Sequence, residues 1–251
     1  MNQQFITEIQ QIFQGYYALL EVQNNFTLNN SNLKITVPQW YEILECLKDR
    51  YKAYHPELIA THFIPNNKSE NIIGGYVSIL ASKRLYNDIY EFSFKNFYIS
   101  IILKKWKDGE LIFKDPYAPV LLEIIVNYRN RDCILSKVWM NYLFGILARP
   151  NSQLETNLDV EEIVITGRNM MQQIEKDLRR NVLYVDSDTV FLHCHDKNLQ
   201  EIEEYYKTLP YDFFYDKHNY AMFVDKKKYL LLENLNGIKS RGLIRQLGII
   251  K

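Results

Sequence analysis

The chain has 251 residues, of which 47% are hydrophobic and 24% charged, and its 30 basic and 30 acidic residues leave a formal net charge of zero. This composition is typical of a soluble globular protein with one large domain or two small ones. It excludes a global basic field that would attract nucleic acid or an acidic membrane, so any such attraction must come from a local patch. No run of about 18 apolar residues is present, so no membrane-spanning segment is predicted.

The first 110 residues combine predicted helices with predicted strands. Apolar residues at helical spacing predict an amphipathic helix over 2–20 and a second helix over 36–55. The polar loop 65–71 is the best candidate for a domain boundary. After this loop the chain is rich in strand-forming residues, which predicts strands over "IIGGYVSIL" (72–80) and "IYEFSFKNFYISIIL" (89–103).

The second half of the chain alternates predicted helices with predicted hairpins. Helical spacing recurs over 117–148 (two helices joined by the polar "NYRNRD"), 159–180 and 198–209. Two strand-forming runs flank Ser187 and Asp188, which is typical of a hairpin. Two further strands joined by "NLNG" are predicted over 220–243, with a basic cluster at the base of the first. Antiparallel hairpins mixed with helices predict an α+β fold.

Cysteine and histidine usage gives no sign of a structural metal or a disulfide framework. Cys46, Cys133 and Cys194 are scattered, odd in number and form no CxxC pair, so we expect a reducing compartment. His193 and His195 lack a third and fourth ligand at useful spacing, which argues against zinc. The first ten residues have no apolar core segment, so no secretory signal is expected. The abundance of Asn, Ile, Lys and Tyr is typical of AT-rich genomes, and we expect an intracellular protein, in the cytoplasm of a virus-infected cell or in a mitochondrion.

Two aspartates, Asp186 and Asp188, stand one residue apart in "YVDSDTVF". On a strand, or at the tip of a tight hairpin, their side chains project to the same side. Carboxylates that close repel one another unless a cation or a basic group neutralises them, and Mg²⁺ prefers oxygen ligands together with substrate phosphates. Aspartate and serine are also common turn residues, so the motif by itself fits either a metal site or a polar turn.

Two lysine-containing stretches are further candidates for phosphate contacts. "KVWMNYLFG" places Lys137, Asn141 and Gly145 near one face of a helix, where the lysine could hold a triphosphate. An amphipathic helix with a capping glycine fits the same residues. "DKKKYLLLE" (225–233) suits sequence-independent phosphate contacts or, equally, an edge strand protected by charge.

In their order and spacing these motifs resemble the polymerase core of family B DNA polymerases. "GGYV" (74–77) is similar to the Gly-Gly segment before the family's first palm strand, and "LYNDIYEFSFKNFYISII" (85–102) to its pattern LY…DFxSLYPSII. "KVWMNYLFG" resembles KxxxNSxYG of the fingers helix, "ITGR" (165–168) resembles TxTGR, and "YVDSDTVF" resembles YxDTDS. "KKKYLLL…NGIKSRGL" resembles the KKxY segment and its KxxGL continuation. The resemblance covers residues 71–245.

The resemblance implies roles for individual residues. Tyr98 matches the tyrosine that stacks on the sugar of the incoming nucleotide and excludes ribonucleotides. Asp186 and Asp188 match the paired catalytic aspartates, of which the second is a direct metal ligand in the family. The other nucleotide-binding matches are Lys137, Asn141 and Gly145. The matches to the primer–template contact are Lys227, Lys228 and Tyr229.

The departures from the family concern the metal site. Family B catalysis uses two metal ions, held between one aspartate of the first palm strand and one of the hairpin, to activate the primer 3′ oxygen and steady the leaving pyrophosphate. The gapless match places Ser93 at the first aspartate, and a neutral hydroxyl cannot bridge two Mg²⁺ ions. Glu91 lies on the same strand face about 6.5–7 Å away, so it would replace that aspartate only after a register shift. Ile99 replaces a proline, and Tyr142 and Phe144 replace the serine and tyrosine of the fingers motif.

The resemblance also predicts the domain organisation. The expected parts are an N-terminal helical segment (1–70), a first part of the palm (71–110), the fingers (111–148) and a second part of the palm (149–251). No acidic exonuclease motifs precede residue 70, and the family's thumb would begin where this sequence ends. We therefore expect a weak grip on DNA, unless a second chain supplies the thumb or the exonuclease.

Two functions stay open at this point. The chain is either a nucleotidyltransferase core acting in DNA replication on a DNA primer–template with dNTPs and Mg²⁺, as one piece of a split enzyme or with impaired catalysis, or an inactive polymerase-derived protein. In the second case it binds nucleic acid or serves as a structural subunit of a larger assembly. The hydroxyl of Ser93 at the catalytic position leads us to expect weak activity or none.

Overall fold

The computed structural model divides the chain into two compact units. The described residues are Thr7, Gln11, 37–54, 74–129, 143–145, 160–194, 196–234 and 237–241. The first unit is built from Met1–Glu70 and Ile102–Val160, and the second from Asn71–Ile101 and Glu161–Lys251. The helix expected over 2–20, the loop 65–71 and the second helix of 117–148 lie almost entirely outside the described residues. The predicted division into N-terminal segment, palm and fingers stays a prediction.

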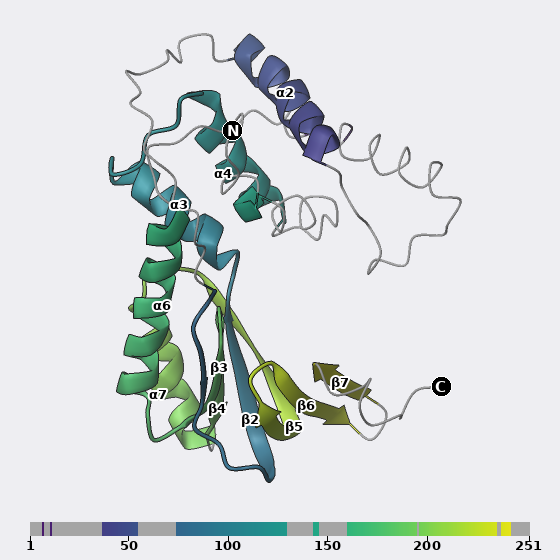
Figure 1. Ribbon diagram of the computed structural model, residues 1–251, viewed down its shortest axis with the longest axis vertical. Helices are drawn as coiled ribbons and strands as arrows, with labels where there is room; N and C mark the ends of the chain where they lie inside the picture. Colours follow the sequence, from purple (N-terminus) through teal and green to yellow (C-terminus); the bar gives the residue numbers. More distant parts are fainter. Residues whose placement is uncertain are drawn as a thin grey trace, which may run out of the picture. The chain divides into compact units, whose positions relative to one another are not determined.

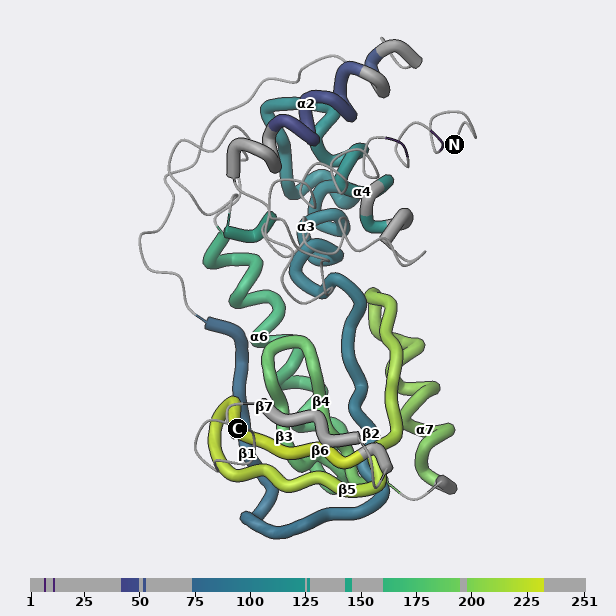
Figure 2. Tube along the Cα trace, turned by 90° about the vertical axis from the view of Figure 1, so that its right-hand side faces the viewer, coloured from purple at the N-terminus to yellow at the C-terminus, as the bar shows by residue number. Residues whose placement is uncertain are grey.

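A seven-stranded antiparallel sheet forms the centre of the second unit, in the order β1-β3-β4-β2-β5-β6-β7 (Figure 2). The strands are β1 (Val77–Ile79), β2 (Leu85–Phe94), β3 (Val182–Asp186), β4 (Thr189–His193), β5 (Phe213–Asp225), β6 (Lys228–Asn234) and β7 (Gly237–Arg241). The hairpin predicted around Ser187 and Asp188 is confirmed as β3–β4. Together with the helices, this sheet confirms the predicted α+β fold.

Helices α6 (Val160–Asp177) and α7 (Asp196–Lys207) run along one face of the sheet (Figure 1). Both confirm helices predicted from apolar spacing. Aromatic stacking packs α7 against the sheet. Phe92 of β2 stacks on Tyr206 of α7 with ring centroids 4.6 Å apart. Among the helices that the structure describes, none has the length and apolarity needed to cross a membrane.

The other face of the sheet holds an aromatic cluster, made of Tyr86, Ile89, Tyr184, Phe191, Ala221, Phe223, Tyr229 and Leu231. Tyr86 and Ile89 are three residues apart on β2, although side chains on one face of a regular strand are two apart. Asp88, between them, has a positive φ of 52°. Such an irregularity re-aims the side chains that follow it. Glu91 and Ser93 therefore face the side of the aromatic cluster, whereas Phe92 faces α7.

The strand predicted to continue to residue 103 is wrong beyond Phe94, because Phe97–Lys107 forms helix α3. Asn96 has a positive φ of 49°, which ends β2. The helix then begins with hydrogen bonds from Ser100, whose amide donates to the Asn96 carbonyl at 2.9 Å and whose hydroxyl donates to the Lys95 carbonyl at 3.1 Å. Aromatic and β-branched residues favour strands, but the burial that tertiary packing offers overrides that propensity.

The two strands predicted over 220–243 are three strands in the structure. β5 begins earlier, at Phe213, and a tight turn at Lys226 and Lys227 separates it from β6. The Asp225 carboxylate accepts a hydrogen bond from the Lys226 amide at 2.7 Å, and Lys227 has a positive φ of 59°. Aspartate is a turn former of this kind. The basic cluster therefore lies at a hairpin tip and not at the base of a strand.

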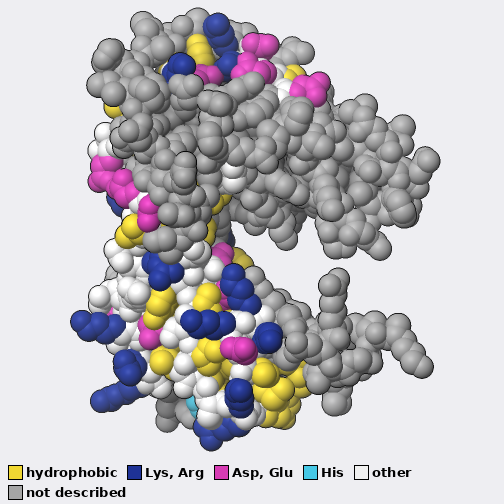
Figure 3. Space-filling model, in the orientation of Figure 1, with side chains coloured by type: hydrophobic (Ala, Val, Ile, Leu, Met, Phe, Trp, Pro, Cys, Tyr) yellow, Lys and Arg dark blue, Asp and Glu magenta, His cyan; other side chains and the backbone are white. Residues whose placement is uncertain are grey.

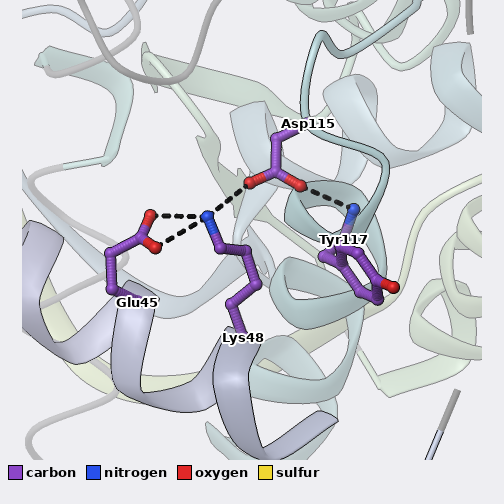
Figure 4. Close-up of polar contacts among 4 residues, drawn as sticks. All are labelled: Glu45, Lys48, Asp115 and Tyr117. Carbon is purple, nitrogen blue, oxygen red and sulfur yellow. Dashed lines mark hydrogen bonds and ion pairs between the residues drawn. The ribbon is translucent and has the colours of Figure 1, made fainter. Parts of the chain in front are cut away.

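The first unit contains helices α2 (Val37–Tyr54) and α4 (Tyr117–Arg129), which confirm the helix predicted over 36–55 and the first of the two predicted over 117–148. Lys48 of α2 links them, with its ammonium 2.7 Å from Glu45 and 3.0 Å from Asp115 (Figure 4). The Tyr117 amide donates to the other oxygen of Asp115 at 3.0 Å, so Asp115 caps α4. Burial alone would lower the pKa of Lys48, but its hydrogen bonds to Glu45 and Asp115 raise it.

Candidate nucleotide and metal site

The turn between β3 and β4 holds the two aspartates in different surroundings. Ser187 has a positive φ of 63°, and its amide donates to the Tyr76 carbonyl at 2.7 Å. Asp186 is buried, with 2% of its surface exposed, and accepts a hydrogen bond from the Ser187 hydroxyl at 3.3 Å. Asp188 is half-buried. Two carboxylates are thus held on one tight turn, as the sequence predicts.

Ser93 lies in the same row of the sheet as Asp186. It pairs with Thr189 on β4, and Thr189 pairs with Asp186 on β3. Two strand spacings separate the backbones of Ser93 and Asp186 by about 9.5–10 Å. The Ser93 and Thr189 hydroxyls are hydrogen-bonded at 2.8 Å, and the Phe94 amide donates to the Asp188 carbonyl at 3.0 Å. Two neutral hydroxyls, hydrogen-bonded to each other, therefore stand next to Asp186 in this row.

Glu91, the nearest other carboxylate on this strand face, has a partner of its own. Its Oε2 lies 2.7 Å from Nε2 of His218, a fully buried side chain on β5. Glu91 itself is only 8% exposed. Separating such a pair inside the protein is costly, since each group was desolvated to form it. Sequence reasoning missed His218, because it lies 127 residues from Glu91.

Tyr98, in the first turn of α3, lies against three other motifs. A Cβ added to Gly75 would lie 2.8 Å from the Tyr98 hydroxyl and 2.6 Å from Ser187 Oγ. A Cβ added to Gly167 would lie 3.0 Å from Cε1 of Tyr98. The structure thus brings together the Gly-Gly segment, the TGR motif, Tyr98 and the aspartate turn, which is the β3–β4 turn at residues 186–188.

The pKa of Tyr98 is affected by both aspartates of the β3–β4 turn. Its pKa is raised to about 12, mainly by burial and also by the negative charges of Asp188 and Asp186, while Arg168 acts in the opposite direction. A phenol with that pKa is neutral at physiological pH. The Tyr98 hydroxyl therefore keeps its proton at that pH.

Arg168 of the TGR motif fixes the segment that covers Tyr98. Its guanidinium donates to the carbonyl of Gly74 at 2.8 Å and to that of Gly75 at 3.4 Å, and lies 5.9 Å from the centre of the Tyr76 ring. The Tyr76 hydroxyl donates to Glu175 at 3.0 Å. Sequence reasoning quoted the TGR motif but missed these contacts, since they join residues 93 to 99 positions apart.

The turn at Lys226 and Lys227 contacts the β3–β4 hairpin through Tyr184. The Lys227 amide donates to the Tyr184 hydroxyl at 2.6 Å, and the rings of Tyr184 and Tyr229 meet edge to face at 5.6 Å. Lys227 is exposed, and the Lys228 ammonium lies 4.0 Å from Asp225. In Figure 3, lysines and arginines are spread over the visible face of the sheet unit among apolar and acidic side chains. Lys226 and Lys227 are thus local positive charges on an exposed turn.

The predicted fingers residues are mostly untested. Lys137 and Asn141 lie outside the described residues, as does His195. Gly145 is exposed in a helical segment of the first unit, with no atom within 4 Å of where a Cβ would be. His193 is half-buried, with its ring 6.4 Å from that of Tyr86. The roles of these residues remain predictions.

The residues around Ser93 do not fit the two-ion arrangement that the sequence resemblance implies. Ser93 offers only a hydroxyl, which is bonded to Thr189, and the Glu91 carboxylate is bonded to His218. In the part of the chain that the structure describes, no group of three or more His, Cys, Asp or Glu side chains is placed to hold a metal ion. Asp186 and Asp188 remain as a pair of carboxylates on one turn.

Comparison of this fold with solved structures finds the family B DNA polymerase from the hyperthermophilic archaeon Pyrobaculum calidifontis, with a TM-score of 0.54 and 17% sequence identity. The fold is polymerase-like. The match covers 80% of this chain and 32% of that polymerase. No protein-family model and no curated protein sequence matches the chain. At this identity the similarity establishes the fold alone. The polymerase-like sheet carries the aspartate turn and Ser93, and Tyr98 lies on α3, the helix that follows β2.

Proposed function

We propose that this chain is a polymerase-derived protein that binds DNA and nucleotide on its polymerase-like fold, with nucleotidyl transfer weak or absent. The observation that carries the proposal is the hydrogen-bonded pair of Ser93 and Thr189, in the same strand row as Asp186. Phosphoryl transfer depends on positioning and on neutralising the charge that develops on the phosphate. A hydroxyl pair cannot hold the second metal ion that this neutralisation uses.

The roles proposed for the retained residues follow from the resemblance. Tyr98 would face the sugar of the nucleotide, and Asp186 and Asp188 would hold a single Mg²⁺ together with the nucleotide phosphates, as carboxylates commonly do for this ion. The ion would supply charge neutralisation to the phosphates. The proposed primer–template contacts are Lys227, Lys228 and Tyr229. The proposed fingers contacts to the nucleotide are Lys137, Asn141 and Gly145.

A second candidate is a subunit of a larger assembly, either one piece of a split polymerase or a structural component without catalysis. The observation that favours it is the formal net charge of zero, which gives the chain no global attraction to nucleic acid.

Primer extension tests the proposal. We expect little or no extension by the unaltered chain with Mg²⁺ or Mn²⁺, and measurable extension by Ser93→Asp. Ser93→Asn, which has the same size without the charge, is the matched control and should stay inactive. Robust extension by the unaltered chain would overturn the proposed loss of catalysis. Absence of duplex binding, even at low salt where phosphate contacts are strongest, would leave the structural subunit as the better candidate.

A further inference from the structure

The Gly-Gly segment, residues 74–76, is fixed on two sides. Arg168 of α6 donates to its first two carbonyl oxygens at 2.8 and 3.4 Å, and Glu175 accepts a hydrogen bond from its tyrosine hydroxyl at 3.0 Å. On the other side, the Ser187 amide donates to the Tyr76 carbonyl at 2.7 Å. Hydrogen bonds to α6 and to the aspartate turn leave this backbone little freedom to shift.

The two glycines of the segment differ in their surroundings. An added Cβ at Gly75 would meet Ser187 Oγ at 2.6 Å, the Tyr98 hydroxyl at 2.8 Å and Ser187 Cβ at 2.9 Å. An added Cβ at Gly74 would meet no atom within 4 Å. The backbone at Gly75 therefore packs directly on Tyr98 and Ser187, whereas Gly74 is open to its surroundings.

We propose that the Gly-Gly segment is a positioning element for Tyr98, in which Arg168 sets the place of the segment and Gly75 sets how close the Tyr98 hydroxyl stands to the aspartate turn. Gly167, next to Arg168 on α6, also packs against the edge of the Tyr98 ring. The segment thus limits the hydroxyl end of Tyr98, while α6 limits the ring. The consequence for the nucleotide rests on the proposed function, in which Tyr98 contacts the sugar. In that case Arg168 and Gly75 determine how well the site distinguishes deoxyribose from ribose.

The positioning is tested without any nucleotide, by NMR of the chain labelled in its tyrosine rings. Loss of one signal in Tyr98→Phe assigns the Tyr98 resonance among those of the 19 tyrosines. Gly75→Ala and Arg168→Gln should both shift this resonance, and Arg168→Lys should restore part of the original shift. Gly74→Ala is the matched control and should leave it in place. An unchanged Tyr98 resonance in Gly75→Ala, or an equal shift in Gly74→Ala, would overturn the proposal.

A second measurement covers the case in which Gly75→Ala unfolds the chain. Ser187→Gly removes the atoms at 2.6 and 2.9 Å and suits the positive φ of that position, and Tyr98→Phe removes the atom at 2.8 Å. In the background of both substitutions, Gly75→Ala should lose most of its effect on the melting temperature. An equal loss in both backgrounds would show that Gly75 does not pack on these two side chains.

Equilibrium binding of dATP and ATP tests the consequence for the sugar. The unaltered chain should prefer dATP, and Gly75→Ala and Arg168→Gln should reduce the ratio of the two affinities toward one. A shifted Tyr98 resonance with an unchanged ratio would overturn the role in sugar discrimination. Failure of the unaltered chain to bind either nucleotide would count against the proposed function, while the NMR measurement still decides the positioning.

Discussion

Replacing His218 by alanine should destabilise the second unit strongly. His218 is fully buried, and its partner Glu91 is only 8% exposed, with 2.7 Å between Nε2 and Oε2. Removing one partner of a buried pair leaves the other without compensation and costs about 3–5 kcal/mol. We therefore expect His218→Ala to lower the free energy of unfolding by about that amount.

Urea unfolding followed by circular dichroism measures this loss, because the free energy of unfolding falls linearly with denaturant. The double variant Glu91→Leu/His218→Leu should recover much of the stability, since apolar residues of similar volume can replace a buried pair. His193→Ala is a control on a half-buried histidine and should cost about 1 kcal/mol. A loss for His218→Ala as small as that of the control would refute the reasoning.

The same pair decides whether Glu91 can act as a metal ligand in place of Ser93. Glu91→Gln keeps a hydrogen-bonding side chain beside His218 but removes the carboxylate. In the Ser93→Asp background, we expect Glu91→Gln to leave primer extension largely unchanged. If a folded Glu91→Gln variant instead lost its Mg²⁺-dependent extension, Glu91 would be supplying the metal site, contrary to its position in the structure.

Two further predictions concern the ion pair of α2 and the alkaline behaviour of the site. Lys48→Met should reduce stability by about 1 kcal/mol, because it removes the contact that holds the cap of α4. Lys107→Met, which breaks a more exposed pair, should cost less in the same urea measurement, and equal losses would contradict this. The pKa of Tyr98 is raised from 10.0 to about 12, so its stabilising contribution is complete below pH 10 and is lost as pH rises toward 12. Tyr98→Phe should therefore flatten the fall in melting temperature over that interval, and an identical fall would count against the burial of this phenol.

The sequence was a good guide where one local signal decided the structure. Apolar spacing predicted α2, α6 and α7, and a polar pair between strand-forming runs predicted the β3–β4 hairpin. It failed at α3, where aromatic and β-branched residues favour a strand but the positive φ of Asn96 ends β2 and a buried helix follows. Local propensity could not reveal that change, because tertiary packing supplies the energy for it.

For the candidate site, too, some residues could be named from the sequence and others could not. Asp186, Asp188, Ser93 and Tyr98 could be named because each stands within a recognisable motif. His218 and Arg168 could not, because their partners are distant in sequence and only the strand pairing and the placement of α6 bring them together. The motifs in the sequence therefore indicated candidate residues, whereas the contacts that hold them in place required the structure.

The strand row from Asp186 through Thr189 to Ser93 makes the Ser93→Asp experiment interpretable. In the unaltered chain the Ser93 hydroxyl is bonded to the Thr189 hydroxyl, and a carboxylate at the same position could accept a hydrogen bond from Thr189. A buried carboxylate that gains such a bond and a bound cation avoids most of the penalty of burying a charge. We therefore expect Ser93→Asp to fold and to gain stability when Mg²⁺ is added. If it folds and binds DNA but still fails to extend a primer, the hydroxyl at position 93 is not what limits activity, and a second chain becomes the next component to add to the assay.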